Sequence, residues 1–220
     1  MHPVWAEATT VRAYVRGIEA DYRLCALRTS CAFRTVSDDA ALVIAGLIPL
    51  RELVRERSEL AETAQDETTT ASARKLAVRA RSLANWQNLW ANSTKGQWTH
   101  RLIPDVGIWT GRKHGEVDFY MTQALSGHGC FRSYLKRFGH EREDGCPSCG
   151  RGVMEDAHHV LFECRRFDEE RSNLEETFSP ERMVPLMIES GRKWEATGKF
   201  VAKVLKELRA LERVRNEGED

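Results

Sequence analysis

The stretch CPSCGRGVMEDAHHVLFEC, residues 146–164, holds three of the chain's six cysteines and two of its seven histidines. Its first two cysteines are two residues apart and are followed by a glycine, which allows a tight turn that points both thiols at one spot. The whole pattern is C-x2-C-x9-H-x4-C. Three sulfurs and one imidazole fill a tetrahedral zinc shell and leave no position for water. The pattern therefore predicts one structural Zn²⁺ with four ligands: Cys146, Cys149, Cys164 and one histidine, either His159 or its neighbour His158.

His158 competes with His159 for the fourth ligand position. On a straight helix, at about 100° per residue, His159 lies roughly 140° from Cys164 and His158 roughly 120° away on the other side. Either histidine works only if the helix frays near Cys164. Both spacings are ordinary for paired zinc ligands, so geometry leaves the two histidines open.

The cellular compartment decides whether the cysteines could form disulfides instead of binding metal. The N-terminal MHPVWAEATTVRAY has no basic segment before an apolar one, and no run approaches the roughly 20 apolar residues of a membrane span. We expect a soluble, intracellular protein, nuclear and/or cytoplasmic rather than secreted, with no membrane partner. In a reducing compartment six cysteines rarely form a disulfide framework, so the main alternative to zinc is reduced, buried cysteines.

Apolar periodicity and helix-end signals predict a mainly α fold. Ser37 is a good N-cap, and we interpret the Asp38-Asp39 pair as capping the same helix rather than as metal ligands. The polar stretch QDETTTASA predicts a linker. The expected organisation is a helical segment at 1–64, the linker at 65–73, a basic helical segment at 74–142, a zinc knuckle with its following helix at 143–179, and C-terminal helices at 180–220.

Charge is unevenly distributed along a chain whose total formal charge is zero. Residues 71–142 carry 12 basic and 4 acidic residues, a net charge of +8. The rest of the chain therefore carries 21 basic and 29 acidic residues, a net charge of −8. A basic middle of this kind is typical of nucleic-acid binding. Trp86 and Trp90 lie within it, but tryptophans at helical spacing are more often core than stacking platforms for bases. The candidate phosphate contacts are Arg74, Lys75, Arg79, Arg81, Arg132, Lys136 and Arg137; alternatively, these side chains form a solvated face that pairs with the acidic flanks.

Four sequence blocks also carry a family resemblance. FRTVSDDAALVIAGLIPL, GQWTHRLIPDVGIW, HGEVDFYMTQALSGHGCFRSYLKRFG, and CPSCG with EDAHHVLFEC follow one another in this order, from about Ala20 to Phe167. The chain resembles the C-terminal region of polyproteins from non-LTR (LINE-type) retrotransposons. In that family the histidine just before the VLFEC-like run is the ligand, so the resemblance selects His159.

The resemblance implies an RNA-directed DNA polymerase that copies element RNA at a nicked chromosomal site. This chain shows no apolar-flanked YxDD segment, so we expect it to extend no primer alone and its first 60 or so residues to resemble the thumb or connection after the palm. Two functions follow as expectations. The first is a module that binds RNA and/or single-stranded or nicked DNA for the polymerase part of the same polyprotein. The second is a zinc-stapled interaction module that docks on that polymerase without binding nucleic acid itself.

Overall fold

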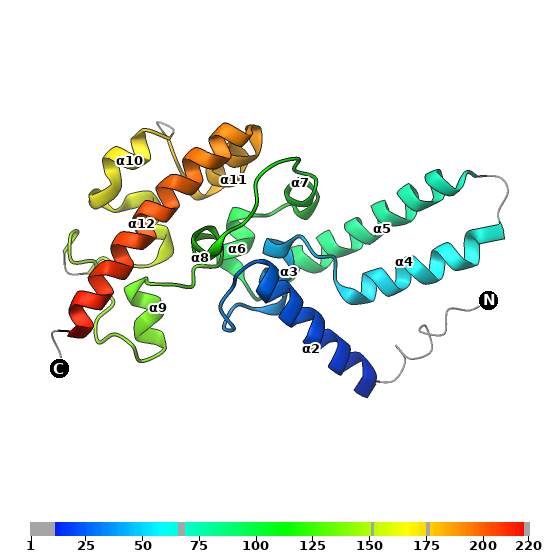
Figure 1. The fold of residues 1–220 in the computed structure, drawn as a ribbon, viewed down its shortest axis with the longest axis horizontal. Helices are drawn as coiled ribbons and strands as arrows, with labels where there is room; N and C mark the ends of the chain where they lie inside the picture. Colours follow the sequence, from blue (N-terminus) through cyan, green and yellow to red (C-terminus); the bar gives the residue numbers. More distant parts are fainter. Residues whose placement is uncertain (1–11, 66–68, 151, 175–176, 218–220) are drawn as a thin grey trace.

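The structure is a computed structural model that describes residues 12–65, 69–150, 152–174 and 177–217 (Figure 1). Of the described residues, 69% are helical and none lies in a strand; there is only an isolated bridge between Gly145 and Met154. The predicted mainly α fold is confirmed. The helices are α2 (Arg12–Thr29), α3 (Asp38–Ala45), α4 (Leu50–Glu62), α5 (Ala71–Ala91), α6 (Gln97–Leu102), α7 (Val106–Thr110), α8 (Phe119–Ser126), α9 (Arg132–Arg137), α10 (Asp168–Ser172), α11 (Pro180–Glu189) and α12 (Gly191–Glu217), with short turns η1 (Thr63–Gln65), η2 (His159–Glu163) and η3 (Arg165–Phe167).

Helix α3 begins and ends where its cap residues predict. The side chain of Ser37 accepts a hydrogen bond from the backbone N–H of Ala40, and both aspartates lie in the first turn, where the helix dipole favours negative charge. Gly46 ends the helix in the left-handed conformation, at φ 68°. The capping interpretation of Asp38 and Asp39 is therefore confirmed.

Helices α4 and α5 form a hairpin that extends to one side of the molecule (Figure 1). Glu52 is buried between them and accepts hydrogen bonds from Arg55 and from the side-chain amide of Asn85 at 3.0 Å. The expected linker at 65–73 connects these two packed helices; residues 66–68 lie outside the described part of the chain, and the segment from Ala71 onward already belongs to α5.

One connected core holds the described chain together. Its buried residues run from Ala26 to Leu208 and cross the borders of the expected segments. Trp86 and Trp90 are both 2% exposed, and the indole N–H of Trp90 donates to the carbonyl of Ile103 at 2.7 Å. These two tryptophans are therefore core residues and are not free to stack on bases.

The long C-terminal helix finds its partner within the chain. Helix α12 packs on α11 and α8 and crosses the half of the molecule opposite the α4–α5 hairpin (Figure 1). Its apolar stripe is buried from Phe200 to Leu208, but Val214 is 67% exposed. No described helix is both long and apolar enough to cross a membrane.

Candidate metal centre and its surroundings

The CPSCG segment forms a small loop that doubles back on itself. The backbone N–H of Cys146 donates to the carbonyl of Val153 at 2.7 Å, and the N–H of Gly150 donates to the carbonyl of Cys146 at 3.1 Å. Gly150 and Gly152 both have a φ of 95°, which side chains with a Cβ rarely adopt. The two glycines thus allow the reversal that places Cys149 beside Cys146.

The second half of the group depends on a π-turn. In η2 the backbone N–H of Cys164 donates to the carbonyl of His159 at 2.7 Å, an i→i+5 bond in place of the i→i+4 bond of an α-helix. A turn closed in this way brings residues five apart together, whereas a straight α-helix separates them by roughly 140°. Asp156 accepts a hydrogen bond from the backbone N–H of His159 at 2.8 Å and so fixes the start of the turn.

These two local structures bring the four predicted ligands together. One donor atom from each of Cys146, Cys149, His159 and Cys164 lies within 4.8 Å of the others. The sulfur of Cys164 is 3.8 Å from that of Cys146 and 3.9 Å from that of Cys149. Tetrahedral bonds of about 2.3 Å would separate two sulfurs by about 3.8 Å, whereas a disulfide needs about 2.05 Å. All six cysteines are free, and the group could hold a metal ion.

Two further observations test whether a cation fits this group. His159 is 6% exposed, and neither of its ring nitrogens has a hydrogen-bond partner among the described residues. A buried nitrogen without a partner is costly, and a metal ion would supply one. Burial also raises the pKa of Cys146 to about 11. A bound dication would oppose this effect by stabilising the thiolate. The fit to a cation rests on the chemistry and spacing of the four donors.

Charged side chains around the group tie it to its neighbours. Arg171 donates to the carbonyl of Cys164 at 3.1 Å, and Arg166 pairs at 2.5 Å with Glu155, which is 1% exposed. Arg132 donates to the carbonyl of Gly145 at 2.8 Å. The supporting roles of Glu155, Arg166 and Arg171 were not predicted, because the pattern of charges along the chain carries no signal that Glu155 and Arg171 are buried or that Arg166 pairs with Glu155.

His158 lies outside the ligand group. Its ring is 6.1 Å from that of Trp98 and 6.0 Å from that of Phe162, and its side chain is 30% exposed. The structure thus brings His159, and not His158, to the three cysteines.

The predicted phosphate contacts do not form one patch. Arg74, Lys75, Arg79 and Arg81 lie on the first half of α5, at the outer end of the hairpin, whereas Arg132, Lys136 and Arg137 lie on α9, at the other end of the molecule (Figure 1).

Most of these side chains also have partners. Four form ion pairs: Arg79 with Glu56, Arg81 with Glu59, Arg132 with Glu141, and Lys136 with Asp144. Arg74 donates to the carbonyl of Thr69 at 2.9 Å. Lys75 and Arg137 are exposed and form no ion pair within the described ranges, although Arg137 lies over the ring of Phe138.

The fold and the site define a class: a mainly helical protein with a Cys₃His group built into its core. The chain is 34% identical over 157 residues to the retrovirus-related Pol polyprotein from type-1 retrotransposable element R1 2 of Nasonia vitripennis, covering 65% of this chain and 38% of that protein. It is 26% identical over 186 residues to the R1 4 polyprotein of the same organism, covering 75% of this chain and 46% of that protein. It is 32% identical over 100 residues to the R1 polyprotein of Popillia japonica, and this match covers 45% of this chain and 38% of that protein.

The chain is thus a homologue of the Pol polyproteins of R1 non-LTR retrotransposons, and the predicted resemblance is confirmed. It spans less than half the length of the relatives described above. No protein-family model and no solved structure matches it.

Proposed function

We propose that this chain is a zinc-stabilised, nucleic-acid-binding part of a non-LTR retrotransposon Pol polyprotein. The observation that carries the zinc assignment is the Cys₃His group itself, with a buried histidine whose ring nitrogens have no hydrogen-bond partner among the described residues. Thiolate and imidazole donors suit zinc, and four protein ligands complete its tetrahedral shell. Zn²⁺ bound in such a closed shell contributes folding stability and has no open position for catalysis.

The nucleic-acid part of the proposal rests on the relationship to Pol polyproteins and on the surface around α9. The resemblance implies an RNA-directed DNA polymerase, which must hold its template and its nicked target. Arg137 is exposed beside Phe138, and the rings of Phe138 and Tyr134 are 4.9 Å apart. Cations next to accessible aromatic rings are the usual means of holding single strands without sequence preference.

A second candidate is an interaction module that docks on the polymerase part of the same polyprotein. The ion pairs of Arg79, Arg81, Arg132 and Lys136 favour it, because a cation already paired with a carboxylate is less available to a phosphate. Under this reading zinc staples a helical scaffold, and the polymerase part supplies all contacts to nucleic acid.

Titration of the zinc-loaded full chain with fluorescent single-stranded RNA and DNA separates the two candidates. Binding through about four phosphate contacts should make the logarithm of affinity fall against the logarithm of salt with a slope near −3, at about 0.7 per contact. Absence of binding at low salt, together with capture by the polymerase part, would favour the interaction module.

A further inference from the structure

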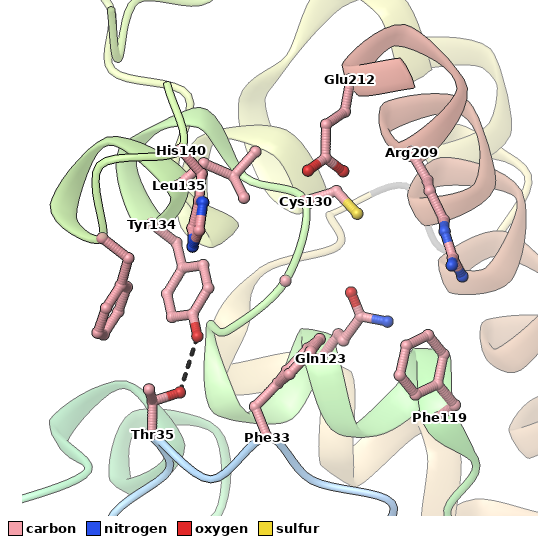
Figure 2. Close-up of a pocket in the computed structure, with 12 residues that line it drawn as sticks. Phe33, Thr35, Phe119, Gln123, Cys130, Tyr134, Leu135, His140, Arg209 and Glu212 are labelled. Atoms are coloured by element: carbon pink, nitrogen blue, oxygen red, sulfur yellow. Dashed lines mark hydrogen bonds between the residues drawn. The ribbon is translucent and has the colours of Figure 1, made fainter. Parts of the chain in front are cut away.

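A cavity of about 370 Å³ lies between the α2–α3 loop, α8, α9 and α12 (Figure 2). Its volume is within the range of pockets that hold small ligands. Residues far apart in the sequence line it, including Phe33, Gln123 and Arg209. It does not include any of the four candidate metal ligands.

Aromatic rings form a continuous wall of this cavity. The ring centroids of Phe33 and Phe119 are 5.9 Å apart, those of Phe33 and Tyr134 are 6.3 Å apart, and those of Tyr134 and Phe138 are 4.9 Å apart. The hydroxyl groups of Tyr134 and Thr35 form a 2.7 Å hydrogen bond, which fixes the tyrosine ring (Figure 2). Phe33 is 37% exposed and Phe138 is 42% exposed, so planar apolar surface remains accessible.

The amide of Gln123 supplies the polar group of the cavity. Gln123 is 2% exposed, and its Oε1 atom has no hydrogen-bond partner among the described residues. Gly129 makes room for this amide, since a Cβ at position 129 would come within 2.2 Å of Oε1. A buried amide oxygen without a donor is unfavourable, and a ligand that brings an N–H group would satisfy it.

Helix α12 contributes the charged groups. Arg209 points into the space beside Gln123 and Phe119, while Glu212 lies next to Cys130 on the other side (Figure 2). A planar arginine suits both stacking on rings and contact with phosphate. The cavity thus combines an aromatic wall, an amide oxygen without a hydrogen-bond partner and a cation.

We propose that this cavity takes one unpaired nucleobase of single-stranded RNA or DNA. The base packs against the aromatic wall of Phe33, Tyr134 and Phe138, the amide of Gln123 hydrogen-bonds its edge, and Arg209 contacts the adjoining phosphate. An amide offers both a donor and an acceptor, and every base presents a π-face, so the site tolerates different bases. The inference rests on the proposed nucleic-acid binding and names the place where one base is held.

The test compares a fluorescent single-stranded RNA with an abasic oligomer of the same length and phosphate number. The wild-type chain should bind the RNA more tightly than the abasic oligomer. Phe138→Ala should weaken RNA binding by about tenfold, the usual effect of removing one stacking ring. Its effect on the abasic oligomer should be small. Ile108→Ala, which removes an exposed apolar side chain on α7 outside the cavity, is the matched control and should change neither affinity.

Gln123→Met separates a ligand contact from a purely structural role. This substitution removes a buried amide oxygen that has no hydrogen-bond partner, so the thermal midpoint should not fall, yet RNA binding should weaken several-fold. Phe33→Ala gives an independent check if either of the other variants loses its fold. If all three pocket variants bind RNA as tightly as the wild type, the pocket inference is wrong.

Other outcomes separate this inference from the proposed function. If the wild-type chain binds RNA and the abasic oligomer equally, nucleic-acid binding stands and the base pocket falls. If it binds neither, both proposals fail. If the pocket variants instead lose binding to the polymerase part, the cavity holds a protein side chain and the base assignment is overturned.

Discussion

The carbonyl of His159 accepts a hydrogen bond from the backbone N–H of Cys164 at 2.7 Å. In a regular α-helix the side chains of His159 and Cys164 would lie on different faces. The i→i+5 bond brings these two candidate metal ligands close together. It also leaves His158 packed near Trp98 and Phe162. The selection of one histidine over its neighbour therefore depends on a local irregularity in the helix.

Replacing Cys149 with Ser should remove the bound metal. The variant loses one of the sulfurs of the Cys₃His group, so we expect zinc content after dialysis to fall from about one ion per chain to a small fraction. Elemental analysis of the purified chain measures this. Cys25→Ser, at an exposed cysteine outside the group, should keep its full zinc content, and a Cys149 variant with full zinc would refute the assignment.

Removing zinc with a chelator should loosen the chain unevenly. Metal binding and folding are coupled in small sites, so hydrogen exchange should accelerate over residues 146–164. Exchange within the α4–α5 hairpin should change little, because its own contacts, such as that between Glu52 and Asn85, hold it together. An unchanged exchange rate at 146–164 would show that the loop does not depend on metal.

Charge reversal should distinguish basic side chains that are free to contact phosphate from those already held in ion pairs. Lys75→Glu combined with Arg137→Glu should weaken nucleic-acid binding and reduce the steepness of the salt dependence by about 1.4, at about 0.7 per contact. Arg79→Glu combined with Arg81→Glu breaks two ion pairs on the α4–α5 hairpin, so it should lower stability more than it changes the salt slope. Equal salt slopes for the two double variants would argue against this division.

His128 should make the fold sensitive to acid. Burial, and then the charge of Arg137, lower its pKa from 6.5 to about 4. The unfolded chain therefore takes up a proton between these two values that the folded chain does not, so the free energy of unfolding should fall as pH drops from about 6.5 to about 4.

The comparison with His128→Gln isolates this effect, because every other titrating group is common to both proteins. Urea unfolding at a series of pH values should give a shallower acid loss for the variant than for the wild type. Parallel curves for the two proteins would mean that His128 does not carry this dependence.

Glu52→Ala should destabilise the α4–α5 hairpin. The substitution leaves the amide of Asn85 without its acceptor in a partly buried position, at a cost of about 1 kcal/mol. The midpoint of thermal unfolding measures the loss. Glu62→Ala, at an exposed position on the same helix, is the control and should leave the midpoint nearly unchanged.

Features set by neighbouring residues were predictable from the sequence. The start of α3 follows from Ser37 and its end from Gly46, and the three cysteines of the candidate metal site follow from spacing within one short segment, where spacing alone leaves His158 and His159 open. Each of these depends on interactions over a few residues, for which sequence patterns carry direct information.

Features that depend on distant segments were not predictable. The α4–α5 hairpin pairs Arg79 with Glu56, and the cavity combines Phe33, Gln123 and Arg209. A periodic pattern shows which face of a helix is apolar, but not which other helix will cover it. The π-turn, although local, was not predicted either. Its i→i+5 bond departs from the regular α-helix that the predicted angle between His159 and Cys164 assumed.

The ligands of the Cys₃His group come from a short span, with Cys146 and Cys164 only eighteen positions apart. Closing so short a loop costs little chain entropy, whereas α12 must return over a much longer distance to reach α8. We therefore expect the loop of the Cys₃His group to close first during synthesis at the ribosome, and α12 to arrive later on a surface already formed. A chain made without zinc would present α12 with an unfinished surface, and would be exposed to proteases for longer.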